Sequence, residues 1–479
     1  MTDPALAAAL ERIRSAPDGP QVGAFFDYDG TVIDGYSAAT FYRHRLRRMQ
    51  VGLREVAQLI MLGLRGLEDE EDFGRLLTLG FAGWAGHSEQ ELLDLGEHLF
   101  AGSIASTVYP EAWQLVNAHR QKGHTVVLAS SATRFQVGPA ARALGIDDVL
   151  CTEVEVNDAG QLTGRTMGNP LWRSGKAAAV KTFAKVHGID RRSSFAYSNG
   201  DEDVPFLLSV ARATAVNPQP DLAAEADERG WPVLAFTSRG RPSLVEAVRS
   251  AAAIGGTIGG FATGIALGML NGSRREGVDH GAVLGAEVGL ALAGVQVNVQ
   301  GEANLYERRP AVYLFNHQSQ LDMVLLCRLM QRSFTGVAKK ELRNDPMFGV
   351  FLRYADMAFV DRGDPAQARA ALEPAVAKLR DGVSLVVAPE GTRSATPAIG
   401  AFKKGAFHVA MQAQVPVVPI VIRNSGQLMA PKSLVISSGV VDVAVLSPVP
   451  TTRWTPQNLD RQVARVREMY VKTMRNWPR

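Results

Sequence analysis

Two carboxylates stand where the first strongly apolar segment of the chain ends. Residues 22–26 form an apolar run that predicts a β-strand, and the sequence DYDGT that follows carries Asp27 and Asp29. Parallel strands of an α/β sheet present their carboxyl ends to ligands, so both side chains are expected at a binding edge. One carboxylate can attack a phosphoryl group while the other protonates the leaving oxygen, and a bound Mg²⁺ offsets the repulsion between anions. The pattern therefore indicates phosphoryl chemistry.

Further phosphate-binding candidates follow in order along the chain. The apolar strand predicted at 125–129 ends in Ser130, whose hydroxyl can hold a phosphoryl oxygen, and Lys176 and the acidic turn SNGDEDVP at 198–205 come later. This ordered set resembles the haloacid dehalogenase-like hydrolase superfamily, and within it the phosphoserine-phosphatase-like branch with a helical cap.

The resemblance implies a role for each of these side chains. Asp27 would be the nucleophile and Asp29 the acid/base, and Ser130 and Lys176 would clamp the phosphate. Mg²⁺ would be the cofactor, and its side-chain ligands would be Asp27, Asp29, Asn199 and Asp203.

Asn199 departs from the family pattern, because an aspartate is usual at the first metal-binding position of this turn. Asparagine binds Mg²⁺ through its carbonyl oxygen but supplies no charge, which lowers metal affinity. Asp201 can substitute only if the turn is rearranged. Two interpretations therefore stay open. One is a working phosphatase acting on phosphoserine or a lipid phosphate, and the other is a weakened module with a mainly structural role.

A histidine and an aspartate form a second candidate site in the other half of the chain. A strand predicted at 311–315 leads into NHQSQLD, which places His317 at the strand exit and Asp322 five residues later, in the first turns of a predicted helix. An imidazole oriented by a carboxylate is a general base that can deprotonate a hydroxyl as it attacks a thioester. A pair acting in this way requires no protein nucleophile, but a histidine and an aspartate at this spacing are by themselves more often a structural hydrogen bond.

The motifs that follow His317 strengthen this interpretation. In chain order they are KKEL at 339–342, FVDR at 359–362, PEGTRS at 389–394, FKKGA at 402–406 and VPVVPI at 415–420. Together they resemble the glycerolipid acyltransferase family over about residues 297–450, and most closely the 1-acylglycerol-3-phosphate acyltransferases.

This second resemblance implies an enzyme that makes phosphatidic acid. Lysophosphatidic acid would be the acceptor, and acyl-CoA or an acyl carrier protein would be the donor. Glycerol 3-phosphate or another lysophospholipid stays open as acceptor. Lys403 and Lys404 meet phosphates of coenzyme A, the membrane surface or only solvent. The positions that match the acceptor-binding residues of the family are Arg362, Glu390, Gly391, Thr392 and Arg393, and the arginine fork and glycine turn suit a phosphate.

The elements that must position these residues predict an α/β fold in three parts. The first is a Rossmann-like hydrolase domain at 1–240 with an inserted helical cap at about 35–108. A linker and a membrane-associated helical hairpin follow at 241–299, and an α/β acyltransferase domain occupies 300–479. Within the last part we expect strands at 311–315, 357–360, 384–388, 417–422 and 440–446, and a C-terminal helix at about 456–477.

The predicted hairpin is rich in glycine and begins with an uncharged segment at 251–270. That length suits a bilayer core. Glycines recur every fourth residue at 256, 260, 264 and 268, and the same spacing returns at Gly281, Gly285, Gly289 and Ala293, so two helices can approach closely. Glu287 argues against a second span, which favours a hairpin dipping into one leaflet. Two alternatives remain. One is a buried hairpin within a soluble protein, and the other is dimerisation between chains through the helix faces that these glycines and Ala293 form.

Charge and cysteine content agree with a membrane enzyme that faces the cytosol. From Gly301 onward the chain has 24 Lys and Arg and 14 Asp and Glu, whereas the preceding part has 27 and 34. A basic rear half suits anionic substrates and lipids, and no nucleic-acid-binding signature accompanies it. Cys151 and Cys327 are expected to be buried free thiols, and the N-terminus lacks the apolar core of a secretory signal. We therefore expect the cytoplasmic face of the cell membrane.

Overall fold

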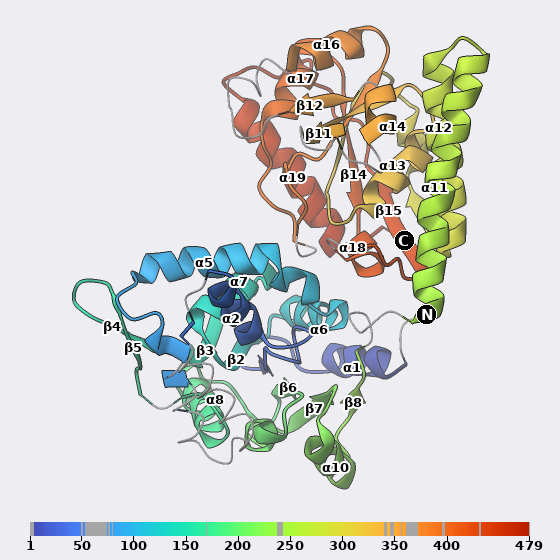
Figure 1. Ribbon diagram of the computed structural model, residues 1–479. Coiled ribbons are helices and arrows are strands. Elements are labelled where there is room, and N and C mark those ends of the chain that lie inside the picture. The colour runs from blue at the N-terminus through green and yellow to red at the C-terminus, as the bar shows by residue number, and fades with distance from the viewer. Residues whose placement is uncertain are drawn as a thin grey trace. The chain divides into compact units, whose positions relative to one another are not determined.

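The protein, seen in a computed structural model, divides into two compact units, Met1–Arg241 and Pro242–Arg479 (Figure 1). The structure describes residues 4–48, 51–52, 74, 77–78, 80–168, 170–236, 243–339, 343–344, 349–355, 357–360, 372–394, 398–430 and 433–478. Arg362, residues 340–342 and much of the predicted cap therefore lie outside the described residues.

The front unit is built on a six-stranded sheet in the order β3-β2-β1-β6-β7-β8. Its strands are β1 (Gly23–Phe26), β2 (Thr125–Thr133), β3 (Asp148–Thr152), β6 (Phe195–Ser198), β7 (Arg212–Val216) and β8 (Val233–Leu234). Its main helices are α1 (Pro4–Arg14), α6 (Pro110–Gln121), α7 (Arg134–Leu144), α8 (Ser174–Val186) and α10 (Pro220–Arg229). The fully buried β1 runs parallel to β2 on one side and to β6 on the other. Asp27 follows β1 directly, so it lies at the edge of the sheet formed by the carboxyl ends of parallel strands. The predicted Rossmann-like α/β fold with a parallel sheet is confirmed.

Two chain segments, one before and one after the inserted cap, connect it to this sheet and are hydrogen-bonded to each other. Asp34 donates its backbone N–H to Thr107 O at 2.8 Å, and Tyr109 donates to Val32 O at 2.9 Å. The described part of the cap is mainly helical, with α2 (Ser37–Arg47) and α5 (Glu89–Gly102). Because α2 begins at Ser37, the cap starts eight residues after the second candidate carboxylate, Asp29.

The rear unit contains a seven-stranded sheet in the order β12-β11-β13-β10-β14-β15-β9. Its strands are β9 (Val295–Gln300), β10 (Val312–Phe315), β11 (Phe334–Lys339), β12 (Ala358–Val360), β13 (Ser384–Val387), β14 (Val417–Ile422) and β15 (Gly439–Val445). Among the described strands of this sheet only β14 and β15 pair antiparallel, and the buried β10 is the central strand. The five predicted strands are confirmed to within one residue at each end.

Eight of the described strands were not predicted individually. For β3, β6, β7 and β8 of the front sheet the sequence predicted only a general alternation of helices and strands. The others are β9 and β11 of the rear sheet and the small front hairpin of β4 (Val154–Val156) and β5 (Leu162–Thr166). β9 reads VQVNVQ, an alternation of apolar and polar residues that is itself typical of a half-buried strand, so it was predictable. β11 reads FTGVAK and has neither such an alternation nor a continuous apolar run. Their place in the sheet is decided by partners distant in sequence, since β9 pairs with β15 and β11 with β12 and β13.

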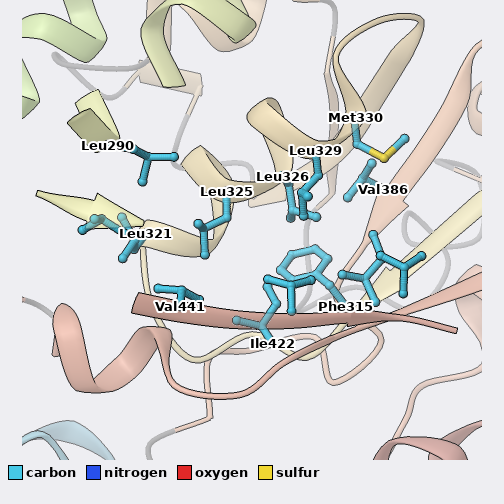
Figure 2. Packing of buried hydrophobic residues seen from close by; sticks show 14 of the residues in the cluster. Leu290, Phe315, Leu321, Leu325, Leu326, Leu329, Met330, Val386, Ile422 and Val441 are labelled. Atoms are coloured by element: carbon cyan, nitrogen blue, oxygen red, sulfur yellow. The ribbon is translucent and has the colours of Figure 1, made fainter. Parts of the chain in front are cut away.

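Apolar side chains fill both faces of the rear sheet. On one face, α13 (Leu321–Met330) packs Leu325 and Leu326 above Phe315 and Ile422 (Figure 2). The other face is covered by α16 (Leu372–Arg380), α17 (Gly405–Ala413) and α19 (Leu459–Arg475). Burying one such side chain contributes roughly 1.5–3 kcal/mol, so the strand that leads to His317 is firmly held from both sides.

The glycine-rich segment forms a hairpin of α11 (Leu244–Leu270) and α12 (Arg274–Ala293) within the rear unit (Figure 1). The small faces meet as predicted, with Gly260 against Gly285 and Gly264 against Gly281. α12 also packs on α13, and its Glu287 accepts a hydrogen bond from Arg328 at 3.1 Å. The charge that argued against a second span therefore forms a partly exposed ion pair with α13. By length and composition α11 is the one described helix that could cross a membrane.

The close packing of this hairpin predicts opposite effects for two alanine substitutions on α11. A Cβ at Gly264 would overlap the backbone of Gly281, whereas a Cβ at Gly255 would meet nothing within 4 Å. Gly264→Ala is therefore expected to lower the free energy of unfolding by about 1–3 kcal/mol. Gly255→Ala, the matched control, should raise it by up to about 1 kcal/mol through helix propensity. Urea unfolding in detergent measures both, and equal effects would contradict the packing.

Candidate active sites

The front candidate site is centred on a buried ion cluster. Lys176, at the start of α8, donates to Asp27 Oδ1 at 2.8 Å and to Asp203 Oδ2 at 2.6 Å. Ser198, at the end of β6, donates to the same Asp203 oxygen at 2.6 Å. Asp27, Lys176 and Asp203 are all less than 9% exposed, so the sheet brings together three predicted site residues that lie up to 176 positions apart in sequence.

Burial controls the protonation of this cluster. It raises the pKa of Asp27 to about 7, while the neighbouring Lys176 acts in the lowering direction. It raises the pKa of Asp29 to about 6, against two hydrogen bonds that favour the charged form. Burial opposes the charge on Lys176, yet Asp203 and Asp27 together raise its pKa above the usual value. Asp29 can therefore retain a proton closer to neutral pH than an exposed carboxyl, as an acid catalyst requires.

The cap supplies the groups that orient Asp29. Ser37, the first residue of α2, donates to Asp29 from its backbone N–H at 2.7 Å and from its hydroxyl at 3.1 Å. Gln136 of α7 donates to the Ser37 hydroxyl at 3.2 Å. Sequence reasoning missed Ser37 and Gln136, because only the tertiary fold brings Ser37 of the cap to Asp29 and Gln136 of α7 to Ser37.

Ser130 lies at the predicted place, near the end of β2 beside the strand that carries Asp27. It is 1% exposed, and its hydroxyl accepts a hydrogen bond from Ala132 N at 3.1 Å. The hydroxyl proton can still point to a phosphoryl oxygen, since an acceptor oxygen keeps its own donor. The placement agrees with the predicted phosphate clamp.

Two of the four predicted metal ligands, Asp27 and Asn199, lie next to each other and share a hydrogen-bond donor. Thr31, which belongs to the DYDGT motif, donates to Asp27 Oδ2 at 3.3 Å and to Asn199 Oδ1 at 3.1 Å. Asp203 Oδ1 is buried without a hydrogen-bond partner among the described residues. Asp201 accepts the backbone N–H of Leu222 at 2.7 Å, so its carboxylate caps α10 and does not replace Asn199. Within the described residues, no three acidic, histidine or cysteine side chains cluster as a metal site.

The rear candidate site is a histidine held by an aspartate. His317 Nδ1 lies 2.8 Å from Asp322 Oδ2, and that oxygen also accepts the backbone N–H groups of Gln318 and Ser319. Asp322 is fully buried, so it accepts from Nδ1–H and leaves Nε2 as the basic nitrogen of the ring. The predicted pair is therefore arranged as a general base and its orienting carboxylate.

The PEGTRS loop, which follows β13, lies against the histidine loop. Ser394 donates its backbone N–H to His317 O at 2.6 Å. Glu390 accepts from His317 N at 3.2 Å and from Gly400 N at 2.9 Å. Burial raises the pKa of Glu390, and these two hydrogen bonds act against that rise. Glu390 thus fixes the backbone beside the base, while its predicted contact with the acceptor stays a prediction.

Cationic groups gather around the glycine turn of this loop. Gly391 adopts a φ of +73°, which suits glycine, and a Cβ there would lie 2.8 Å from the Lys403 ammonium. Arg393 has its Nη1 buried with no hydrogen-bond partner among the described residues. Thr392 is exposed on the same turn. A buried, unpaired guanidinium nitrogen beside a backbone turn is a fitting receptor for a phosphate.

Lys403 and Lys404 have different environments. Lys403 lies at the glycine turn, whereas Lys404 forms an exposed ion pair with Asp460 at 2.6 Å. Of the two, Lys403 is the better candidate for binding a substrate phosphate. Arg362, the other predicted acceptor-binding arginine, lies outside the described residues.

Comparison with known proteins gives a family match for each of the two units. The haloacid dehalogenase-like hydrolase family matches residues 24–208, and the acyltransferase family matches residues 296–423. The phosphoserine phosphatase SerB1 of Mycobacterium tuberculosis is 34% identical over 258 residues, which are 53% of this chain and 82% of that protein. The chain therefore belongs to the haloacid dehalogenase-like hydrolase family, and it joins this domain to an acyltransferase domain.

Relatives of the rear unit are acyltransferases. The 1-acyl-sn-glycerol-3-phosphate acyltransferase of Saccharomyces cerevisiae is 35% identical over 187 residues, which are 38% of this chain and 61% of that protein. The crystal structure of the 1-acyl-sn-glycerophosphate acyltransferase PlsC from Thermotoga maritima is similar at 25% identity and a TM-score of 0.36, covering 42% of this chain and 82% of that one.

Proposed function

We propose that the protein transfers an acyl group from acyl-CoA to 1-acylglycerol 3-phosphate and so makes phosphatidic acid at the cytoplasmic face of the membrane. The observation that carries this proposal is the His317–Asp322 pair, whose backbone is bonded to the PEGTRS loop at Ser394 and Glu390. The base and the phosphate receptor are therefore held as neighbours. An acyl carrier protein is the alternative donor.

The proposed reaction uses these groups in one displacement. The Arg393 turn binds the phosphate of the acceptor and brings the glycerol hydroxyl to His317 Nε2. The imidazole takes the hydroxyl proton as the oxygen attacks the thioester carbonyl, and the C–S bond then breaks. The imidazolium returns the proton to the departing thiolate, giving an ester and a free thiol. Asp322 stabilises the imidazolium while the charge exists, because its buried carboxylate lies 2.8 Å from Nδ1.

Acyl transfer in detergent tests this proposal. Purified full-length protein is incubated with a long-chain acyl-CoA and lysophosphatidic acid, glycerol 3-phosphate or lysophosphatidylcholine, and the products are separated by chromatography. Phosphatidic acid should form fastest. Faster acylation of another acceptor would replace the proposed substrate, and transfer only from acyl carrier protein would replace the donor. No transfer from either donor to any acceptor would refute the proposal.

The exposed face of α11 supports the membrane part of the proposal. No charged residue occurs between 251 and 270, and Leu267, Met269 and Leu270 are exposed although apolar. A soluble protein rarely leaves so large an apolar surface in water. A bilayer covers it and also holds the lipid substrates near the site, so we propose that the hairpin inserts into one leaflet.

Charged substitutions on this face are expected to release the protein from lipid. The variant carrying Met269→Glu and Leu270→Glu should bind anionic phosphatidylglycerol vesicles at least about a hundredfold more weakly, since each buried apolar side chain contributes roughly 1.5–3 kcal/mol. Val186→Glu is the matched control, because Val186 is 73% exposed in the front unit and Met269 is 69% exposed. Vesicle co-sedimentation measures the binding. Unchanged binding of the double variant would remove α11 as the lipid contact.

We also propose that the front domain is a Mg²⁺-dependent phosphatase. Asp27 and Asp203 supply two carboxylates, and Asp203 Oδ1 is buried without a hydrogen-bond partner among the described residues. Mg²⁺ is usually bound by one or two carboxylates together with water and substrate phosphate, so these residues suit it. The metal would offset the negative charge between Asp27 and the phosphate. Asp27 would attack the phosphorus, Asp29 would protonate the leaving oxygen, and Lys176 and Ser130 would hold the phosphoryl oxygens. The substrate is a phosphomonoester whose organic part stays open between phosphoserine and a lipid.

Asn199 favours the alternative, a front domain with a structural or regulatory role. Asn199→Asp distinguishes the two, since it adds the charge that the metal position lacks. If the front domain is a working phosphatase, the unmodified protein, which has Asn199, should hydrolyse a generic phosphomonoester in the presence of Mg²⁺. Activity that appears only in Asn199→Asp would support the structural role for the natural sequence.

A further inference from the structure

The carboxylate of Glu390 joins two segments of the acyl-transfer site. Its Oε1 accepts the backbone N–H of His317 at 3.2 Å, and its Oε2 accepts the backbone N–H of Gly400 at 2.9 Å. Glu390 is only 7% exposed, so water competes little for these bonds. The position of the catalytic backbone therefore depends on where Gly400 lies.

Gly400 is in turn held by the C-terminal helix. Arg467 of α19 donates from Nε to Gly400 O and from Nη2 to Ile399 O, both at 2.7 Å. A guanidinium holds two acceptors in a fixed geometry, and its charge strengthens both bonds. These contacts form a continuous chain from Arg467 through Gly400 and Glu390 to His317.

The same helix also contacts the strand that leads to His317. Tyr470 is fully buried and donates its hydroxyl to Leu314 O at 2.6 Å, three residues before the catalytic base. Its ring packs edge-on against Phe402, at 5.1 Å between centroids. α19 thus holds both β10 and the segment that carries Gly400, so it can fix one relative to the other.

We infer that Arg467 is a positioning residue for acyl transfer. It touches neither the base nor the substrate, but it fixes residues 399–400 so that Glu390 keeps the backbone of His317 in the reactive geometry. This inference rests on the acyl-transfer reaction proposed above. It gives the C-terminal helix, which lies beyond the residues matched by the acyltransferase family, a part in that reaction.

Steady-state kinetics on three variants test the inference. Arg467→Ala removes both donors, Arg467→Lys keeps a charge that can reach one carbonyl, and Arg465→Ala is the control from an exposed position of the same helix. Arg467→Ala is expected to lower kcat by about ten- to a hundredfold, because small misplacements of a catalytic group cost up to about this much. KM for acyl-CoA and the thermal midpoint should change little. Arg467→Lys should restore part of the rate, and Arg465→Ala should keep all of it.

A double-mutant comparison separates positioning from general stability. In the Glu390→Gln background one carboxylate oxygen is replaced by an amide that cannot accept, so the Gly400–Glu390–His317 link is already weakened. Arg467→Ala should then lower kcat by much less than in the unmodified protein. The inference would be overturned if Arg467→Ala lowered kcat equally in both backgrounds, or if the loss of rate merely matched the loss of folded protein. If Arg467→Ala does not fold, full activity of Arg467→Lys would overturn it as well.

Two failures are distinguishable in this experiment. If the unmodified protein transfers no acyl group, the proposed function fails and the kinetic comparison has no basis. If it transfers acyl groups and Arg467→Ala does so at the full rate, the proposed function stands and only the role of Arg467 is wrong.

Discussion

His317→Ala is expected to lower kcat/KM for phosphatidic acid formation by about a thousandfold or more. A positioned general base contributes about 10²–10⁴-fold to such a reaction, and alanine leaves no group that can take the hydroxyl proton. The imidazole is partly exposed and packs beside Phe315, so its removal opens little space in the core. The variant should therefore stay folded, with a thermal midpoint near that of the unmodified protein.

Asp322→Asn separates the charge of the aspartate from its geometry. The amide oxygen can replace Oδ2 and accept from His317 Nδ1 and from the Gln318 and Ser319 backbone, but it cannot stabilise an imidazolium by charge. We expect a clear loss of kcat that is smaller than for His317→Ala. The rates are measured with acyl-CoA and lysophosphatidic acid in detergent. A His317→Ala variant that retains a tenth of the activity would exclude His317 as the base.

Asp27→Asn should abolish phosphomonoester hydrolysis by the front domain, with a fall in kcat of about a thousandfold or more. Asparagine has no carboxylate oxygen to form the phospho-enzyme bond, so no covalent intermediate can arise. The variant should still fold, because burial raises the pKa of Asp27 to about 7 and so disfavours its ionised form in the folded protein. Lys176 keeps its ion pair with Asp203 at 2.6 Å in the variant.

Two controls accompany this variant. One is removal of the metal ion, and the other is the acyl-transfer activity of the rear unit. Hydrolysis by the unmodified protein should require Mg²⁺ and disappear with a chelator. Acyl transfer by Asp27→Asn should equal that of the unmodified protein, since His317 and Asp322 belong to the other unit. A generic substrate such as p-nitrophenyl phosphate reports the hydrolysis. Full hydrolysis by Asp27→Asn would remove Asp27 as the nucleophile and support a different phosphoryl acceptor.

Much of each site was predictable because the decisive residues are close in sequence. Asp27 and Asp29 are two residues apart at a strand end, and His317 and Asp322 are five apart across a strand-to-helix turn. Local backbone geometry alone brings such pairs together. The paired glycine faces of α11 and α12 were predictable for a similar reason. Residues four positions apart lie on the same face of a helix, and the short turn between the two helices lets these faces pack together.

Other features needed the tertiary fold. Nothing near Ser37 in sequence marks it as a donor to Asp29, and nothing near Glu287 marks Arg328 as its partner. Asp201 illustrates the same limit, because its carboxylate caps α10 through Leu222, twenty-one residues later. The free energy of such contacts depends on distances that separate segments of chain reach only after the core has packed.

The sequence by itself indicated the two protein families, the order of their motifs, most of the strands that carry those motifs and the hairpin of two glycine-rich helices. Tertiary structure alone decided that Lys176 lies between Asp27 and Asp203, that α12 packs on α13, and that Arg467 reaches the loop of Glu390. The physical reason is the range of the forces. Periodic patterns and short motifs act through the local backbone, whereas buried ion pairs and hydrogen-bonded loops exist only where the fold excludes water and brings distant residues within about 3 Å.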